Sequence, residues 1–462
     1  MSGRASTPSA IGASLPGDDH TIAALATAPG RSALATVRVA GPATRTIALA
    51  LLDPAPTVPR RATRCTVRDA EGRAIDDAVA TFYAAPHSFT GDDLLEISTH
   101  GGLVVPIAVL VAAIAAGARQ AEPGEFTRRA VLHGKLDLLQ AEAVADLIDA
   151  RSSAAQQAAL RQLDGGLSAR IGDLRQRILT LEALLAYDID FPEEDDGPVP
   201  RARIERTTHD LIEALGALLA TSAQGTLVHE GALVVLAGAP NVGKSSLFNA
   251  LLGEARAIVT EVPGTTRDAI EAVLDLPGYP LRLVDTAGLR DTMDVVERLG
   301  IEASGRYLSR AALVLLCADS ADGLTAGLAA ARALGAREIL AVATKGDIVP
   351  HRDEFDADVV VSAQTGAGLR ALLEAIEERL ARRHGLPALD APALTSARQQ
   401  AAVAAAHREL IAFDEAWRTA ALPPSVAATH VSAAATALGA LIGAVHVDDM
   451  LDVLFASFCV GK

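Results

Sequence analysis

Aromatic residues and cysteines are scarce in this sequence. Aromatics make up only 3 % of the 462 residues, although half of the residues are hydrophobic. The cores must therefore be built from Ala, Leu, Val and Ile, a composition that favours helix. The three cysteines, Cys65, Cys317 and Cys459, are far apart and form no CxxC pair. A disulfide framework or a zinc site is therefore not expected, and a reducing cytoplasm fits.

Long apolar runs and an excess of basic residues are also missing. No run of about 18 uninterrupted apolar residues occurs, so no membrane-spanning helix is predicted. The formal net charge is −16. A surface that binds nucleic acid everywhere needs clustered Lys and Arg, so an RNA partner must be held at a restricted site or shared with another subunit. We interpret residues 1–19 as a disordered leader, because they lack the apolar stretch of a signal peptide.

Residues 20–134 have the pattern of a mixed α+β module. Short β-like runs, Ala35–Val39, Ala78–Tyr83 and Leu94–Ser98, alternate with Gly/Pro turns, and the apolar run Val104–Ala116 predicts a helix.

Helical patterns fill residues 135–230 and 386–462. In the first segment, hydrophobic residues recur at steps of three and four and are predicted to share one helical face: Leu160, Leu163, Leu167, Ile171, Leu174, Ile178, Leu181 and Leu185. Gly165 and Gly166 weaken its middle by about 1 kcal/mol each relative to Ala. The acidic residues between 188 and 196 are interpreted as a solvated loop rather than a metal or catalytic cluster.

Residues 231–385 alternate strand-like runs with helical segments, which is typical of a doubly wound α/β domain. The expected strands are Leu233–Ala237, Leu281–Val284, Leu313–Leu316, Ile339–Ala343 and Val359–Val361. Because helical segments flank this domain on both sides, we expect one helical domain of two separated parts that an inserted α/β domain interrupts.

A glycine-rich loop, Gly238–Ser245 with the sequence GAPNVGKS, follows the first of these strands and opens a helix. This is the context of a Walker A loop. Its glycines let successive N–H groups converge on phosphate oxygens, and the helix N-terminus adds positive potential. Lys244 supplies a charge for the β- and γ-phosphates, and the Ser245 hydroxyl is placed for Mg²⁺. The sequence therefore predicts a P-loop nucleotide site.

Three further motifs follow predicted strands and favour GTP. Asp285–Gly288 (DTAG) can hold the Mg²⁺ shell and offer a backbone N–H to the γ-phosphate. In Thr344–Asp347 (TKGD), the last residue can accept two hydrogen bonds from guanine, and adenine lacks that donor pair. Ser362–Gln364 (SAQ) can present a backbone N–H to the guanine oxygen.

Two positions depart from common GTPase patterns. Thr344 stands where GTPases usually carry Asn, so we expect weaker bracing of the loop without lost guanine selectivity. Leu289 follows DTAG, where many small GTPases place a Gln that orients the attacking water. Leucine cannot hydrogen-bond water, so another group must orient it.

The chain resembles the tRNA modification GTPases of the MnmE (TrmE) family over almost its full length. The resemblance rests on GAPNVGKSSLFNALL (Gly238–Leu252), VPGTTRD (Val262–Asp268), DTAGLR (Asp285–Arg290), VERLGIE (Val296–Glu302), GEFTRRAVLHGKLDLLQAEAVADLI (Gly124–Ile148) and FCVGK (Phe458–Lys462). The last two are the most diagnostic, because generic GTPases lack them. The resemblance implies a tetrahydrofolate-binding and dimerisation domain at 20–134, a helical domain at 135–230 and 386–462, and an inserted Ras-like P-loop GTPase domain at 231–385.

The resemblance also implies the residues of the GTPase site. Glu297 would be catalytic through a bridging water, although an exposed helical glutamate would be the better interpretation without the family match. K⁺ would replace an arginine finger, held by Asn241, Thr260, Val262 and Thr265, while Ser245 and Thr266 would hold Mg²⁺. The implied GTP-binding positions are Asn241, Val242, Gly243, Lys244, Ser245, Ser246, Thr260, Glu261, Val262, Pro263, Gly264, Thr265, Thr266, Asp285, Thr286, Ala287, Gly288, Thr344, Lys345, Asp347, Ser362, Ala363 and Gln364.

The folate-binding positions that the resemblance implies are Arg38, Glu96, Lys135 and Lys462. A carboxylate such as Glu96 can pair with adjacent N–H donors of a pterin, and Arg or Lys can hold the anionic glutamate tail. Taken alone, each of these residues is more simply a surface charge. The family's GRGG turn is replaced here by Gly30–Ala33 (GRSA), a departure that leaves the position of Arg38 in the pattern unchanged.

The function implied is a K⁺-dependent GTPase that modifies carbon 5 of wobble uridine 34 in certain tRNAs. Its expected partners are a second copy of the chain, an MnmG-like flavoprotein that carries FAD and completes a heterotetramer, and tRNA, with no membrane and a cytoplasmic location.

Two rivals remain open on the sequence. A ribosome-assembly GTPase switch would predict an appended basic RNA-binding domain, and none is visible. A stand-alone folate enzyme with a regulatory GTPase domain would turn over folate without tRNA. Cys459 is interpreted as a small packed residue, and a role for it in modification is left as a hypothesis.

Overall fold

The computed structural model describes residues 20–190, 200–254, 257–258, 270–276, 279–285, 307–348, 356–386, 391–444, 454–455 and 458–461. Contacts divide the chain into two compact units: one runs to Ala141 and includes the segment from Val445 onward, and the other spans Glu142–Ala444. The fold class expected from the sequence is confirmed: an α+β module, a two-part helical domain and an inserted Ras-like domain.

The first unit contains a seven-stranded sheet in the order β3-β4-β5-β6-β2-β1-β7. Neighbouring strands are antiparallel except β1 and β7. The strands are β1 (Ile22–Leu25), β2 (Leu34–Ala40), β3 (Leu52–Asp53), β4 (Thr63–Arg68), β5 (Ala74–Tyr83), β6 (Leu94–His100) and β7 (Arg119–Gln120). The helices are α1 (Thr44–Leu51), α2 (Val105–Ala115), α3 (Glu125–Leu132) and the start of α4 (Leu138–Asp149).

Successive side chains of β2 alternate between the hydrophobic core and the opposite face of the sheet. Val37 and Val39 are fully buried in the core with residues of α1 and α2. Because successive side chains of a strand point to opposite faces, Arg38 lies on the other face, where β2 pairs it with Glu96 of β6.

The chain returns to this first unit near its last residues. Pro123 and Val460 form an isolated antiparallel bridge. A Cβ on Gly461, whose φ is +97°, would lie 2.6 Å from the carbonyl oxygen of Leu25, so only glycine fits this close backbone approach.

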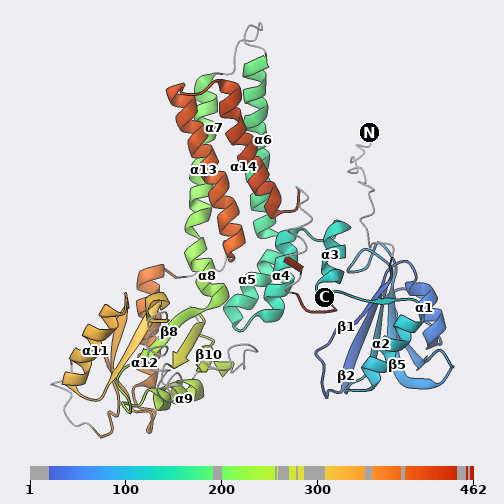
Figure 1. Ribbon diagram of the computed structural model, residues 1–462, viewed down its shortest axis with the longest axis horizontal. Coiled ribbons are helices and arrows are strands. Elements are labelled where there is room, and N and C mark those ends of the chain that lie inside the picture. The colour runs from blue at the N-terminus through green and yellow to red at the C-terminus, as the bar shows by residue number, and fades with distance from the viewer. Residues whose placement is uncertain are drawn as a thin grey trace, which may run out of the picture. The chain divides into compact units, whose positions relative to one another are not determined.

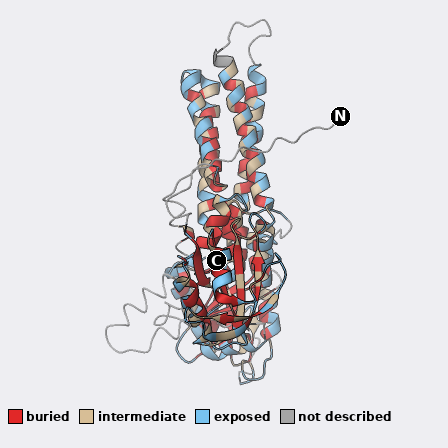
Figure 2. Cartoon of the chain, turned by 90° about the vertical axis from the view of Figure 1, so that its right-hand side faces the viewer, coloured by how far each residue is buried: buried red, intermediate tan, exposed pale blue. Residues whose placement is uncertain are grey.

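Two separated segments of the second unit form one helical bundle. Helix α6 packs against α14 and α7, and α13 packs against α14 and α7, as Figure 1 shows. Their inward positions are buried and their outward positions exposed (Figure 2). The helices are α5 (Ser153–Leu163), α6 (Gly166–Asp190), α7 (Arg201–Ala220), α8 (Ser222–Glu230), α13 (Ala397–Thr419) and α14 (Pro424–Leu441).

One expectation about this bundle was wrong. Leu160 does not share the buried face with Leu167 and Leu174, because the chain turns between α5 and α6 at Gly165, whose φ is +86°. The turn changes the helix direction and leaves Leu160 41 % exposed, whereas Leu167 and Leu174 are buried. The sequence shows the two glycines but not the angle that they permit.

The stretch Arg201–Glu230 is long and apolar enough to cross a membrane by length and composition alone. Core helices pass the same test, so this is weak evidence. In α7 the apolar residues include a buried stripe, with Ile204, Leu211 and Leu215 fully buried. These buried apolar residues of α7 are therefore explained by packing against α6 and α13.

The inserted domain is a second seven-stranded sheet, in the order β14-β13-β12-β8-β11-β10-β9. The five strands from β14 to β11 are parallel, and β10 and β9 are antiparallel. The strands are β8 (Ala232–Ala237), β9 (Ala257–Ile258), β10 (Ile270–Leu274), β11 (Leu281–Asp285), β12 (Leu313–Ala318), β13 (Ile339–Ala343) and β14 (Val359–Val360), with helices α9 (Lys244–Glu254), α11 (Ala321–Ala333) and α12 (Leu369–His384).

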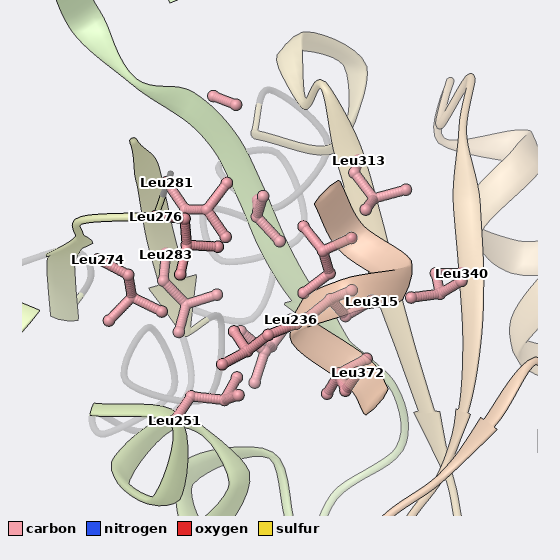
Figure 3. Close-up of a cluster of buried hydrophobic side chains, with 14 of the residues drawn as sticks. Leu236, Leu251, Leu274, Leu276, Leu281, Leu283, Leu313, Leu315, Leu340 and Leu372 are labelled. Carbon is pink, nitrogen blue, oxygen red and sulfur yellow. The ribbon is translucent and has the colours of Figure 1, made fainter. Parts of the chain in front are cut away.

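Both faces of this sheet are covered by apolar cores. In Figure 3, Leu236 of β8, Leu251 of α9 and Leu372 of α12 converge on one face. Burial on both faces explains why β8 and β12 read as continuous apolar runs. The carboxyl ends of the parallel strands meet at one edge, where ligands bind in such folds.

Candidate functional site

The loop between β8 and α9 has a backbone that its glycines require. Gly238 and Gly243 have φ of +141° and +98°, and Asn241 also has a positive φ of +61°. A Cβ on Gly238 would lie 2.2 Å from the carbonyl oxygen of Cys317 on β12. Only glycine therefore allows this loop to lie directly on the neighbouring strand, with its N–H groups at the N-terminus of α9.

The side chain of Lys244 is buried against this loop. Its side chain is 6 % exposed, and its Nζ donates to the carbonyl oxygens of Gly238 and Ala239 at 3.0 and 2.8 Å. The ammonium group is thus held by the loop that is expected to surround the phosphates. Beneath it, burial raises the pKa of the Cys317 thiol to about 12, so this thiol stays protonated near neutral pH and is not a nucleophile.

Ser245 and Asp285 form the oxygen pair expected for Mg²⁺. The Ser245 Oγ donates to Asp285 Oδ2 at 2.7 Å. Asp285 ends β11, which pairs in parallel with β8, and it is 1 % exposed. A hydroxyl and a carboxylate are ligands suited to Mg²⁺, so these two residues fit the ion: the serine by direct contact and the aspartate through its shell.

The segment that follows β14 holds Asp347 in place. The Ser362 hydroxyl, which is almost fully buried, donates to Asp347 Oδ1 at 2.7 Å. An ionised carboxylate has about four acceptor positions, so this bond leaves capacity for the two donors of guanine. The turn that contains Ala363 and Gln364 is closed by a hydrogen bond from Gly366 N to the Ser362 carbonyl oxygen at 2.9 Å.

Thr344 braces the phosphate loop by a direct contact. Its hydroxyl lies 2.5 Å from the carbonyl oxygen of Val242 and 3.1 Å from that of Ala318. One hydroxyl proton makes one strong bond at a time, and the shorter distance favours Val242. The adjacent Lys345, whose φ is +56°, pairs with Asp319 at 2.8 Å. A threonine hydroxyl thus ties the guanine loop to the loop around the phosphates.

The structure brings together Asn241, Val242, Gly243, Lys244 and Ser245 with Asp285 and Thr344. Asn241 and Ser246 are exposed at this edge. The remaining predicted residues of this site lie outside the described part of the chain: Thr260, Glu261, Val262, Pro263, Gly264, Thr265, Thr266, Thr286, Ala287, Gly288 and Glu297.

A second site lies in the N-terminal module. Arg38 Nε donates to Glu96 Oε1 at 2.8 Å, and Tyr83 OH donates to Glu96 Oε2 at 3.4 Å. Lys135 Nζ donates to the Pro86 carbonyl oxygen at 3.1 Å. Three of these residues, Tyr83, Glu96 and Lys135, line a cavity of about 260 Å³ together with Arg60, His87, Ser88, Phe89 and Leu94.

The C-terminal segment also contacts this second site. Arg38 Nη1 donates to the Gly461 carbonyl oxygen at 3.4 Å. The following residue, Lys462, lies outside the described part of the chain. Three of the four folate positions expected from the sequence are therefore gathered, and the fourth follows a residue that contacts one of them.

Sequence reasoning missed the aromatic wall of this cavity. Tyr83 and Phe89 both line it, and burial raises the pKa of Tyr83, with the Glu96 charge adding to the effect. Tyr83 therefore stays protonated and can donate at neutral pH. A usable signal existed: in a chain with 3 % aromatics, these two lie close together at the end of a predicted strand.

Two protein-family models match the chain. The model described as "MnmE helical domain" matches residues 138–459, and the model described as "GTP-binding protein TrmE N-terminus" matches residues 21–135. The two matches together cover nearly all described residues.

Curated relatives align over nearly the whole chain. The tRNA modification GTPase MnmE of Ralstonia nicotianae is 43 % identical over 466 residues, covering 96 % of each chain. The proteins of that name from Azoarcus sp. and Neisseria meningitidis serogroup C are each 42 % identical, covering 97 % and 96 % of this chain and 99 % of their own lengths.

Among solved structures, the G domain of the T. maritima FeoB iron transporter is 30 % identical, covering 32 % of this chain and 98 % of its own. Its TM-score is 0.25.

Proposed function

This chain belongs to the MnmE family of tRNA modification GTPases, and from that premise we propose that it is K⁺-dependent and acts with an MnmG-like flavoprotein. GTP hydrolysis and a role in tRNA modification follow from the family itself. The proposed product is a (carboxymethyl)aminomethyl group on carbon 5 of uridine 34. FAD belongs to the partner subunit, and tRNA would be held by both proteins, which suits a chain of net charge −16.

The position of Asn241 carries the K⁺ proposal. This exposed residue has a left-handed backbone on the loop that holds Lys244, and an amide oxygen there suits a weakly hydrated monovalent cation. Bound K⁺ would offset negative charge on the phosphoryl group that is transferred. Thr260, Val262 and Thr265 would supply its other oxygens, Thr266 would complete the Mg²⁺ site of Ser245, and Glu297 would orient water in place of a glutamine.

The test compares GTP hydrolysis in KCl and NaCl at equal ionic strength. We expect clear stimulation by K⁺ in the wild type and its loss in Asn241→Ala, because the variant lacks the amide oxygen. Asn249→Ala is a matched control, since Asn249 lies exposed on α9 beyond the loop, and it should keep the stimulation. Equal rates in both salts for the wild type would refute the K⁺ site.

We also propose that the cavity of the N-terminal module binds a tetrahydrofolate derivative. Glu96 would accept from the pterin ring, Phe89 and Tyr83 would pack against it, and Lys135 and Lys462 would attract the glutamate tail. Arg38 would fix the Glu96 carboxylate by the ion pair that it makes at 2.8 Å. Binding of a reduced folate, followed by calorimetry, tests this assignment.

A homodimer through this module is proposed as well. Leu103, Val104, Ile107 and Val111 form an apolar face at and along α2 and are 47 to 76 % exposed, which is typical of an interaction surface. Ile107→Glu should shift sedimentation toward the monomer. Leu49→Glu, an exposed apolar residue on α1, is the control and should leave the mass unchanged.

We also propose the limits of the domains and the location of the protein. The folate-binding domain would span 20–134, the helical domain 135–230 and 386–462, and the GTPase domain 231–385, after a leader of residues 1–19. We propose a cytoplasmic location, because tRNA and the partner flavoprotein would be met there.

A further inference from the structure

The hairpin of β10 and β11 runs from the nucleotide site to the helical domain. At one end Ile270 pairs with Asp285, the residue that accepts from Ser245, and at the other end Leu274 pairs with Leu281. The strand ladder joins β10 and β11 over Ile270–Leu274, and an ion pair between Arg282 and Glu271 at 2.6 Å adds one side-chain link between them. The hairpin is therefore a continuous, cross-linked element with one end at the proposed Mg²⁺ site.

Asp275, the residue that follows β10 at the far end of this hairpin, contacts a helix of the helical domain. Both carboxylate oxygens of Asp275 accept from the backbone N–H of Ser153 at 3.1 Å, and Oδ2 accepts from the Ser153 hydroxyl at 2.6 Å. Ser153 is the first residue of α5. A carboxylate is stabilised there, because the first N–H groups of a helix carry partial positive charge and lack partners within the helix.

Apolar packing places the same two elements in one core. Ala154 and Ala158 of α5 and Val228 of α8 belong with Leu274 and Leu281 to the core of the GTPase domain. The first turn of α5 is thus held to the hairpin by hydrogen bonds and by shared apolar contacts. A shift of the hairpin must move this turn or break its bonds.

We propose that Asp275 is a positioning residue that couples the nucleotide site to the helical domain through the N-terminus of α5. The proposal rests on GTP binding at Ser245 and Asp285 and is independent of the K⁺ and folate assignments. A coupling contact requires that the two nucleotide states differ at its far end, so the amide of Ser153 should report which nucleotide is bound.

The test is hydrogen–deuterium exchange of the full chain, with Mg²⁺ and either GDP or a non-hydrolysable GTP analogue. In the wild type, we expect exchange in the first turn of α5 to differ between the two states by about fivefold or more, the lower range of typical coupling energies. Asp275→Ala should remove this difference, because the acceptor of the Ser153 N–H is gone. Ser153→Ala, which keeps its backbone N–H but loses the hydroxyl, should give an intermediate result.

Ser152→Ala is the matched control. Ser152 caps α5 by accepting from Ala155 N at 3.1 Å, and its loss frays the same turn without touching Asp275. This variant should exchange faster in both states yet keep the difference between them, which separates coupling from mere helix stability.

Nucleotide affinity is measured on the same samples with a fluorescent analogue. If both nucleotides bind and the wild type shows no difference at α5, or if Asp275→Ala keeps the wild-type difference, the proposal is wrong. If the wild type binds neither nucleotide, the nucleotide site itself is refuted, and the coupling proposal with it.

Discussion

The two candidate sites of this chain are built in opposite ways. The nucleotide site consists largely of backbone and short side chains in loops that directly follow parallel strands. Gly238, Lys244 and Ser245 all belong to one loop of eight residues, Gly238–Ser245. The cavity of the N-terminal module is lined by long side chains from separate strands and loops, such as Tyr83, Glu96 and Lys135. A site of the first kind is visible as a motif, whereas a site of the second kind exists only after folding.

This difference also separates the consequences of substitution. In the nucleotide site each residue holds a position that the loop imposes, so replacing one should affect GTP and leave folate binding intact. In the N-terminal cavity the reverse should hold. The following experiments test this independence, beginning with the largest expected effect.

Asp347→Asn should weaken GTP binding by about 10³-fold, because two hydrogen bonds to a charged acceptor are lost or reversed. Xanthosine triphosphate, which offers an acceptor where guanine has its amino group, should bind the variant better than GTP. Competition with a fluorescent nucleotide measures both affinities. Unchanged preference for GTP would contradict the assignment of Asp347 to the base.

Ser245→Ala should lower GTP hydrolysis by about 10²-fold, the effect of removing one organising group from a charged site. The rate should also require more Mg²⁺, because a ligand is lost. Ser320→Ala is the control: Ser320 caps α11 in the same domain by accepting from Gly323 N, so its loss should lower stability and not the Mg²⁺ dependence.

Glu96→Gln should reduce binding of a reduced folate by about 30-fold, since a charge-assisted pair of hydrogen bonds becomes a neutral one. GTP hydrolysis without tRNA should remain within about twofold. Parallel calorimetry and phosphate release give the two values. A loss of both activities would show that the two sites are not independent.

Thr344→Val should have the smallest effect, a loss of about 1 to 2 kcal/mol, or 5- to 30-fold, in nucleotide affinity, because the Val242 carbonyl oxygen loses its donor. Valine keeps the shape of threonine, so packing is retained. Thr344→Asn, which restores the residue that GTPases usually carry, should bind GTP at least as well as the wild type. A valine variant with wild-type affinity would show that the hydroxyl contact is dispensable.

The sequence predicted secondary structure best where a strand or helix is a continuous apolar run that turn residues or a motif loop bound. The runs expected in the inserted domain correspond to β8, β11, β12, β13 and β14, and the helix expected at Val104–Ala116 is α2. Two neighbouring strands at one end of the nucleotide sheet, β9 and β10, were not expected, and neither were β1 and β4 of the first sheet. Strands of only two to six residues carry little periodic signal.

Other features depend on contacts between distant residues. The ion pair of Arg38 with Glu96 depends on strand register over 58 positions, and the contact of Asp275 with Ser153 spans 122 positions. The exposure of Leu160 depends on one backbone angle at Gly165. Composition and spacing do not determine these quantities.

The bond between Arg38 and Gly461 also has a consequence for biosynthesis. The two residues are 423 positions apart, so a ribosome that adds about 5 to 20 residues per second needs about 20 to 85 s between them. During that interval the first sheet must persist beside the exit tunnel without its last backbone segment, while the GTPase domain between them is translated and free to fold. The N-terminal module thus leaves the ribosome before the GTPase domain but gains this bond only after that domain has been made.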